Sequence, residues 1–172
     1  MRSEAIFVIV GFLTLVATPN PAERASSPPP QTNADCAVTI ANGIVAGEHH
    51  SDPGSYGNAQ VSVGLWRDGI VVFEPGGAGF ITRDGSLGMK FGWRRGISGQ
   101  LKVEGHRVDA VAPPLRSEVP SGYGDRGFQA TYVIFPTPGC WEVAGGVDDA
   151  TVTFITRVAQ IGDGPAWRRD VP

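Results

Sequence analysis

A cluster of positive charge is the most distinctive chemical feature of this sequence. Residues 86–107 contain five lysine or arginine side chains and one acidic residue, Glu104, so the segment carries a charge of +4 in a chain of net charge −3. The five cations are Lys90, Arg94, Arg95, Lys102 and Arg107. Positive charge gathered on one surface attracts anionic polymers through its field as well as through direct contact.

Alternation of apolar and polar residues predicts where three of these cations point. In residues 87–93 every second residue is large and apolar, which predicts a strand with one buried face. Lys90 and Arg94 then lie on its polar face, and Lys102 lies on the polar face of the next strand. If the two strands are neighbours, the three cations share one sheet face. Arg95 and Arg107 are lesser candidates for the same surface.

Two aromatic residues are candidates for stacking against a ligand. Trp66 falls on a predicted polar face beside a turn, and Tyr123 lies in the glycine-rich loop of residues 122–125. Trp93 and Trp141 fall on apolar faces, so we expect them in the core.

The segment of residues 48–52 holds the one pair of adjacent histidines. His49, His50 and Asp52 offer two imidazoles and a carboxylate, which are ligands for metal ions. Adjacent residues on an extended chain point to opposite sides, so both imidazoles cannot easily face one ion. A small periplasmic metal-binding protein is therefore an alternative, beside a mobile polar loop that continues through residues 53–58.

Motifs of the common enzyme classes are absent from the sequence. It has no G-x-S-x-G, no H-E-x-x-H and no C-x-x-C. The glycine-rich residues 75–79 lack the following helix and the lysine of a phosphate-binding loop. We predict neither catalysis nor a cofactor, and the net negative charge disfavours a general nucleic-acid binder.

Composition and turn residues predict the elements that must position these side chains. The chain has 24 glycines and 14 prolines without a Gly-X-Y repeat, which favours many short strands joined by tight turns. Hairpin turns are predicted at Asp68-Gly69, Asp84-Gly85, Gly105-His106 and Asp148-Asp149. Further strands are expected at residues 37–40 and 128–135. The prediction is an all-β antiparallel β-sandwich of eight to ten short strands over residues 36–161.

Both ends of the chain are expected to lie outside this domain. Residues 1–22 are predicted to be a signal peptide, because the apolar run of residues 5–17 is too short to span a bilayer. The proline-rich residues 23–35 predict a disordered tether, and residues 162–172 a flexible tail. We therefore expect a secreted, periplasmic or envelope-associated protein with no transmembrane span after signal removal. In such a compartment Cys36 and Cys140, the two cysteines, are predicted to form a disulfide.

The C-terminal quarter of the chain resembles a known class of domain. Pro138–Val143, followed by residues 148–154 with their Thr/Val pattern, resembles the closing hairpin of bacterial immunoglobulin-like domains. Together with residues 122–125 it is also similar to a set of uncharacterised secreted bacterial proteins. The resemblance implies an immunoglobulin-like sandwich that serves as a recognition or spacer module, and it implies no catalytic residue.

One departure from that resemblance concerns the disulfide. If Trp141 and Val143 face the core, Cys140 faces the other way, whereas the cysteine of this strand in antibody-type domains points inward. We therefore predict that the disulfide ties the N-terminal strand to an edge or to an outer face.

Together these observations predict an exported, non-catalytic β-sandwich module. Its basic face would bind an anionic envelope polymer, such as a glycan, teichoic acid or lipopolysaccharide, or an envelope protein. The alternatives are the metal-binding protein and a structural spacer without a ligand of its own, whose charged face only prevents edge-to-edge association.

Overall fold

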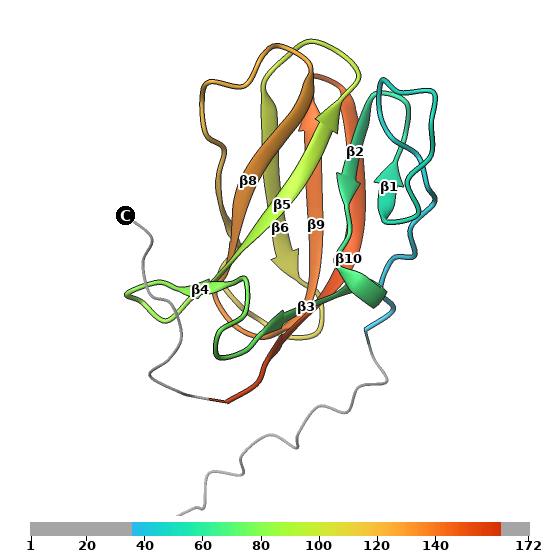
Figure 1. The fold of residues 1–172 in the computed structure, drawn as a ribbon. Helices are drawn as coiled ribbons and strands as arrows, with labels where there is room; N and C mark the ends of the chain where they lie inside the picture. The colour runs from blue at the N-terminus through green and yellow to red at the C-terminus, as the bar shows by residue number, and fades with distance from the viewer. Residues whose placement is uncertain (1–35, 163–172) are drawn as a thin grey trace, which may run out of the picture. The chain divides into compact units, whose positions relative to one another are not determined.

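The computed structural model describes residues 36–162, and the ordered elements in this range are strands (Figure 1). They are β1 (Ser55–Gly57), β2 (Val61–Gly64), β3 (Ile70–Phe73), β4 (Phe80–Ile81), β5 (Leu87–Arg95), β6 (Leu101–Arg107), β7 (Arg116–Glu118), β8 (Gly127–Phe135), β9 (Gly139–Val147) and β10 (Ala150–Gln160), with a 3-10 turn, η2, at Arg67–Gly69. Within this range no helix is long and apolar enough to cross a membrane. The predicted signal peptide, the tether and all of the tail beyond Gly162 lie outside the described residues.

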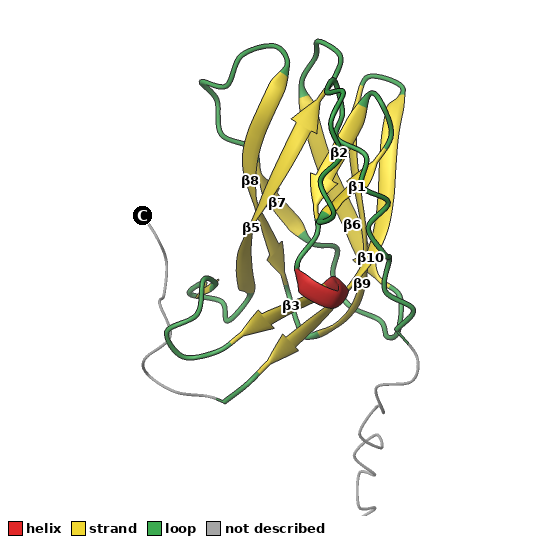
Figure 2. Ribbon diagram, turned by 45° about the vertical axis from the view of Figure 1, so that its right-hand side comes forward, coloured by secondary structure: helices red, strands yellow, loops and turns green. Residues whose placement is uncertain are grey.

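The strands form two sheets that pack face to face as a β-sandwich, which confirms the predicted fold class (Figure 2). The six-stranded sheet has the order β1-β2-β5-β8-β7, and β4 also pairs with β5. The four-stranded sheet has the order β3-β10-β9-β6. The expectation of a wholly antiparallel structure needs one correction, because β3 runs parallel to β10.

The core lies between the sheets and follows the predicted alternation. The inward apolar side chains of β5, which include Phe91 and Trp93, are at most 1% exposed. The ring centroid of Phe154 on β10 lies 5.9 Å from that of Phe91 and 6.1 Å from that of Trp93. Burial of these rings drives the two sheets together. The outward side chains of β5 are then fixed on the opposite face.

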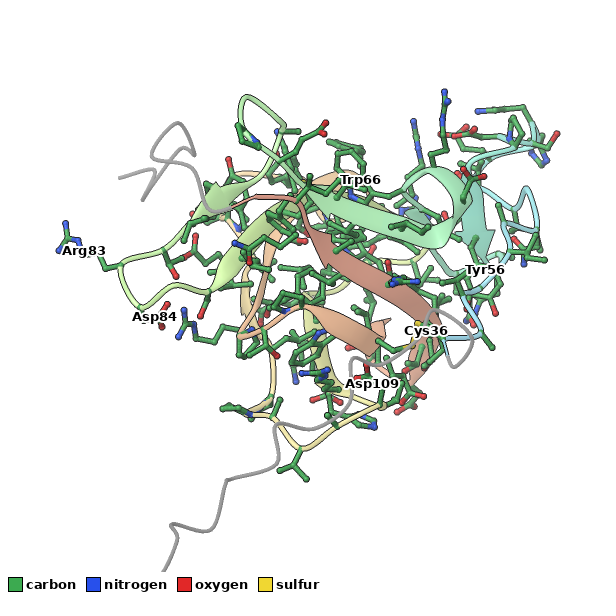
Figure 3. All side chains as sticks on the ribbon, turned by 90° about the horizontal axis from the view of Figure 1, so that it is seen from below. Cys36, Tyr56, Trp66, Arg83, Asp84 and Asp109 are labelled. Atoms are coloured by element: carbon green, nitrogen blue, oxygen red, sulfur yellow. A yellow bond between two sulfur atoms is a disulfide. The ribbon has the colours of Figure 1, made fainter. Side chains whose placement is uncertain are left out.

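Two of the four predicted hairpins are confirmed. β4 and β5 pair across the Asp84-Gly85 turn, and β9 and β10 pair across Asp148-Asp149 with Val147 opposite Ala150. Asp148 takes a positive φ of 50°, which an aspartate tolerates better than most side chains. The β4–β5 hairpin carries Asp84 at its tip (Figure 3).

The other two hairpin predictions are wrong. Asp68 and Gly69 have the expected positive φ values of 55° and 68°, but the turn carries the chain from β2 in one sheet to β3 in the other. Gly105 lies within the continuous strand β6. It is glycine because a Cβ atom there would lie 2.2 Å from the carbonyl oxygen of Glu142 on β9. Close backbone approach, rather than a turn, explains this residue.

The N-terminal segment also differs from the expectation. Residues 37–40 form no strand, although the Thr39 amide donates to the Ile155 carbonyl and the Ile155 amide to the Thr39 hydroxyl. The loop expected to be mobile contains the edge strand β1.

The predicted Cys36–Cys140 disulfide is present, with Cα atoms 5.5 Å apart. Trp141 is fully buried in the core, and Cys140 faces the outer side of β9, beside Arg157 of β10. The bond therefore pins the N-terminal segment to the outer face of the four-stranded sheet, as the alternation predicts. A disulfide fits an oxidising compartment outside the cytoplasm.

Candidate binding groove

The candidate cations do not share one sheet face. Lys90 and Arg94 lie on the outer face of β5, in the six-stranded sheet. Lys102 lies on β6, in the four-stranded sheet, on the opposite outer face of the sandwich. The prediction of one basic face is therefore wrong for Lys102. It failed because the chain crosses from one sheet to the other between β5 and β6, so the two strands are not neighbours.

Internal contacts occupy three of the five cations. Arg94 donates to Glu48 across 2.8 Å. Arg95 is 5% exposed and donates to the carbonyl oxygens of Gly99 and Gly124, which ties two loops together. Arg107 pairs with Asp109 at 2.6 Å, on the opposite side of the domain from Trp66 (Figure 3). These contacts give the three arginines partners within the domain.

Lys90 and Lys102 are exposed and form no ion pair with any residue in the range 36–162. Lys102 lies in a shallow groove of about 330 Å³ that also contains Glu104 and Asp148. Acidic groups therefore outnumber the cation there. Lys90 lies in a different groove, which is lined by aromatic residues and contains no acidic one.

A gap in strand pairing marks the position of Lys90. β8 pairs with β5 along its whole length, so β2 and β4 must both use the other edge of β5. β4 pairs with residues 87–88 and β2 with residues 93–95. Residues 89–92 lie between them and have no strand partner on this edge within the described part of the chain. The chain leaves β2 towards Trp66 on one side of the gap and enters β4 from Ala78 on the other.

Aromatic side chains surround Lys90 on this outer face. A groove of about 500 Å³ crosses β5 here, a volume within the ~300–1,000 Å³ range of small-ligand sites. We call it the Lys90 groove; its lining consists of Trp66, Ala78, Lys90, Gly92, Phe128 and Tyr132.

Glycines on β5 leave room for aromatic rings close to the strand. A Cβ atom at Gly92 would lie 2.8 Å from Cε2 of Phe128, so the absence of a side chain leaves room for that ring. At Gly88 a Cβ atom would meet the Phe80 ring at 2.2 Å. Phe80 in turn packs edge-on against Tyr132, with ring centroids 5.4 Å apart. The contact with Phe80 thus positions the Tyr132 wall of the groove.

The two aromatic candidates from the sequence meet different surroundings. Trp66 lines the Lys90 groove and also packs against the core, so it is partly buried. Tyr123 is 40% exposed and stands edge-on to Phe128, with ring centroids 6.2 Å apart. Tyr123 therefore does not line the groove itself, but it packs against Phe128, which does.

The histidine segment does not assemble a metal site. Among residues 36–162 no three His, Cys, Asp or Glu side chains are grouped to hold an ion. Both carboxylate oxygens of Asp52 accept hydrogen bonds in its own loop, from the Gly54 amide and the Ser55 hydroxyl. These bonds hold the pKa of Asp52 below its usual range. His49 and His50 are exposed, and Nδ1 of His50 lies 3.9 Å from Glu48.

Sequence reasoning missed Phe128 and Tyr132, although a signal for them exists. In β8 the polar residues Gln129 and Thr131 alternate with Phe128, Ala130 and Tyr132, and the structure buries the polar set. The Thr131 hydroxyl satisfies the indole N–H of the buried Trp93 at 3.1 Å, which explains its inward position. Phe128 is left 50% exposed on the outer face.

Comparison of the chain with protein-family models, curated proteins and solved structures finds no match.

Proposed function

We propose that this chain is an exported, non-catalytic module that binds an anionic polymer of the cell envelope through the Lys90 groove. The single observation that carries the proposal is the setting of Lys90, an exposed cation without an ion-pair partner in residues 36–162. It lies in a groove lined by aromatic rings. A carboxylate or phosphate entering the groove would supply the missing partner.

The disulfide and the expected signal peptide support a location outside the cytoplasm. An immunoglobulin-like relationship, suggested by the C-terminal hairpin, is consistent with a recognition module. Residues 36–162 hold no group of three metal-ligating side chains that would support the metal-binding alternative. A spacer without a ligand remains the competing account, and it predicts no specific retention on envelopes.

The proposal is tested by co-sedimentation of the purified protein with bacterial cell envelopes over a salt series. We expect retention that falls as salt rises, because screening weakens the attraction between Lys90 and the anionic polymer. Lys90→Gln should reduce retention at low salt. Absence of retention at every salt concentration would favour the spacer and contradict the proposal.

A further inference from the structure

We infer that the ligand of the Lys90 groove is an acidic glycan, in which a sugar ring stacks on the aromatic walls while its negative group pairs with Lys90. This inference rests on the proposed function and names the chemical class of its ligand. It follows from the shape of the groove as well as from its charge.

The exposed aromatic rings of the groove favour a ligand with an apolar surface that can cover them. Phe128 is 50% exposed, and Trp66 and Tyr132 are each partly exposed around the same groove. A simple polyanion such as polyphosphate has no apolar face with which to cover these rings. The C–H groups on one face of a pyranose are weakly positive and match the negative face of an aromatic ring.

The position of Lys90 beside these rings favours a ligand that also carries a negative charge. Lys90 and Tyr132 are cross-strand neighbours, and Gly92 lies two residues further along β5 beneath the Phe128 ring. A sugar ring resting against the aromatic walls is therefore next to the ammonium group. A neutral glycan would leave this cation without a partner, and an acidic one would not.

The gap in strand pairing beside Lys90 offers main-chain groups that suit a sugar ligand. Residues 89–92 of β5 have no strand partner on one edge in the described range, whereas neighbouring residues of β5 are paired there. Polar main-chain groups beside a few aromatic rings are typical of sites that orient a small polar ligand. Sugar hydroxyl groups can both donate to and accept from such a backbone.

The test compares three kinds of polymer by titration calorimetry with the purified protein. The probes are oligomers of polygalacturonate, alginate and hyaluronan as acidic glycans, cellohexaose as a neutral glycan, and polyglutamate as an anionic chain without sugar rings. We expect at least one acidic glycan to bind about tenfold more tightly than cellohexaose and polyglutamate.

Two kinds of variant separate stacking from charge. Phe128→Ala should weaken binding of the acidic glycan about tenfold, and Trp66→Phe should weaken it less. Because Trp66 also packs against the core, Phe128 is the safer position, and a thermal melt checks that each variant is folded. Lys90→Gln should remove the preference for acidic over neutral glycans. Val111→Ala, at a fully exposed apolar residue outside the groove, is the matched control and should bind normally.

The outcomes distinguish this inference from the proposed function. If polyglutamate binds as tightly as the acidic glycans and Phe128→Ala changes nothing, the glycan inference is overturned and binding of anionic polymers stands. If no glycan binds but envelopes retain the protein through Lys90, the glycan inference is again overturned, and the partner is another anionic component of the envelope, such as a teichoic acid. If neither envelopes nor any probe bind, both proposals fail.

Discussion

The Phe128 ring on β8 lies over Gly92 on the neighbouring strand β5, so that a Cβ atom at residue 92 would come within 2.8 Å of the ring. This relationship shapes one wall of the Lys90 groove. It also accounts for a glycine in the middle of a nine-residue strand, where glycine weakens the strand unless another group approaches closely.

Substitution of Gly92 by alanine tests this relationship. The added methyl group should push the Phe128 ring away from β5 and reshape the groove, so ligand binding should weaken several-fold. Because Phe128 is half exposed and can move into solvent, the free energy of unfolding should change by less than about 1 kcal/mol. Gly54→Ala is the control, since a Cβ atom there meets only a carboxylate oxygen of Asp52, at 3.6 Å, and Gly54 does not line the Lys90 groove. Equal binding by both variants would argue against the Phe128 wall.

Removal of the disulfide should destabilise the domain strongly. Cys36 and Cys140 are 104 residues apart, and a closed loop of that length lowers the entropy of the unfolded chain. The double variant Cys36→Ser/Cys140→Ser should lose about 2–5 kcal/mol of unfolding free energy, measured by urea denaturation. Reduction of the wild-type protein should produce the same loss. A loss below about 1 kcal/mol would show that the N-terminal segment is held by its other contacts.

Gly105→Ala should be far more damaging than a usual glycine substitution. The added methyl group would collide with the Glu142 carbonyl oxygen and with Leu115, and backbone atoms of β9 cannot turn away as a flexible side chain could. We expect a loss of about 3 kcal/mol in the free energy of unfolding. A small effect in urea denaturation would contradict the close approach of β6 and β9 at Gly105.

The stability that Asp84 contributes should depend on pH. Hydrogen bonds from Arg116, Thr82 and Ser86 hold the pKa of Asp84 well below its usual range in the folded protein. Since the folded-state pKa is lowered, the contribution is complete above the unfolded-state value of about 3.9 and declines as pH falls below it. Asp84→Asn should therefore be less stable than the wild type at pH 7, with a gap that narrows by pH 3. A gap that does not change with pH would contradict this assignment.

Features that depend on neighbouring residues in the sequence could be predicted, and features that depend on distant strands could not. The buried face of β5 follows from alternation, and the outward direction of Cys140 follows from the inward direction of Trp141. Asp68-Gly69 shows the limit: the local conformation was correct, yet the next strand joined the other sheet.

The same limit explains the errors at the site. Lys90 and Lys102 are both outward-facing cations, as alternation predicts, but their separation onto opposite faces is decided by the crossing between sheets. The partnership of Arg94 with Glu48 joins residues 46 positions apart. Phe128 and Tyr132 were missed because Gln129 and Thr131, which look like surface residues, are the buried ones.

The central claim is that the Lys90 groove, rather than positive charge in general, holds the ligand. Lys90→Gln and Lys102→Gln remove the same charge from two exposed lysines on opposite faces of the sandwich, so they form a matched pair. The decisive measurement is envelope retention of the wild type and both variants, side by side at low salt. The account predicts that Lys90→Gln loses most of its retention while Lys102→Gln keeps it. Equal losses in both variants, or a loss confined to Lys102→Gln, would contradict it.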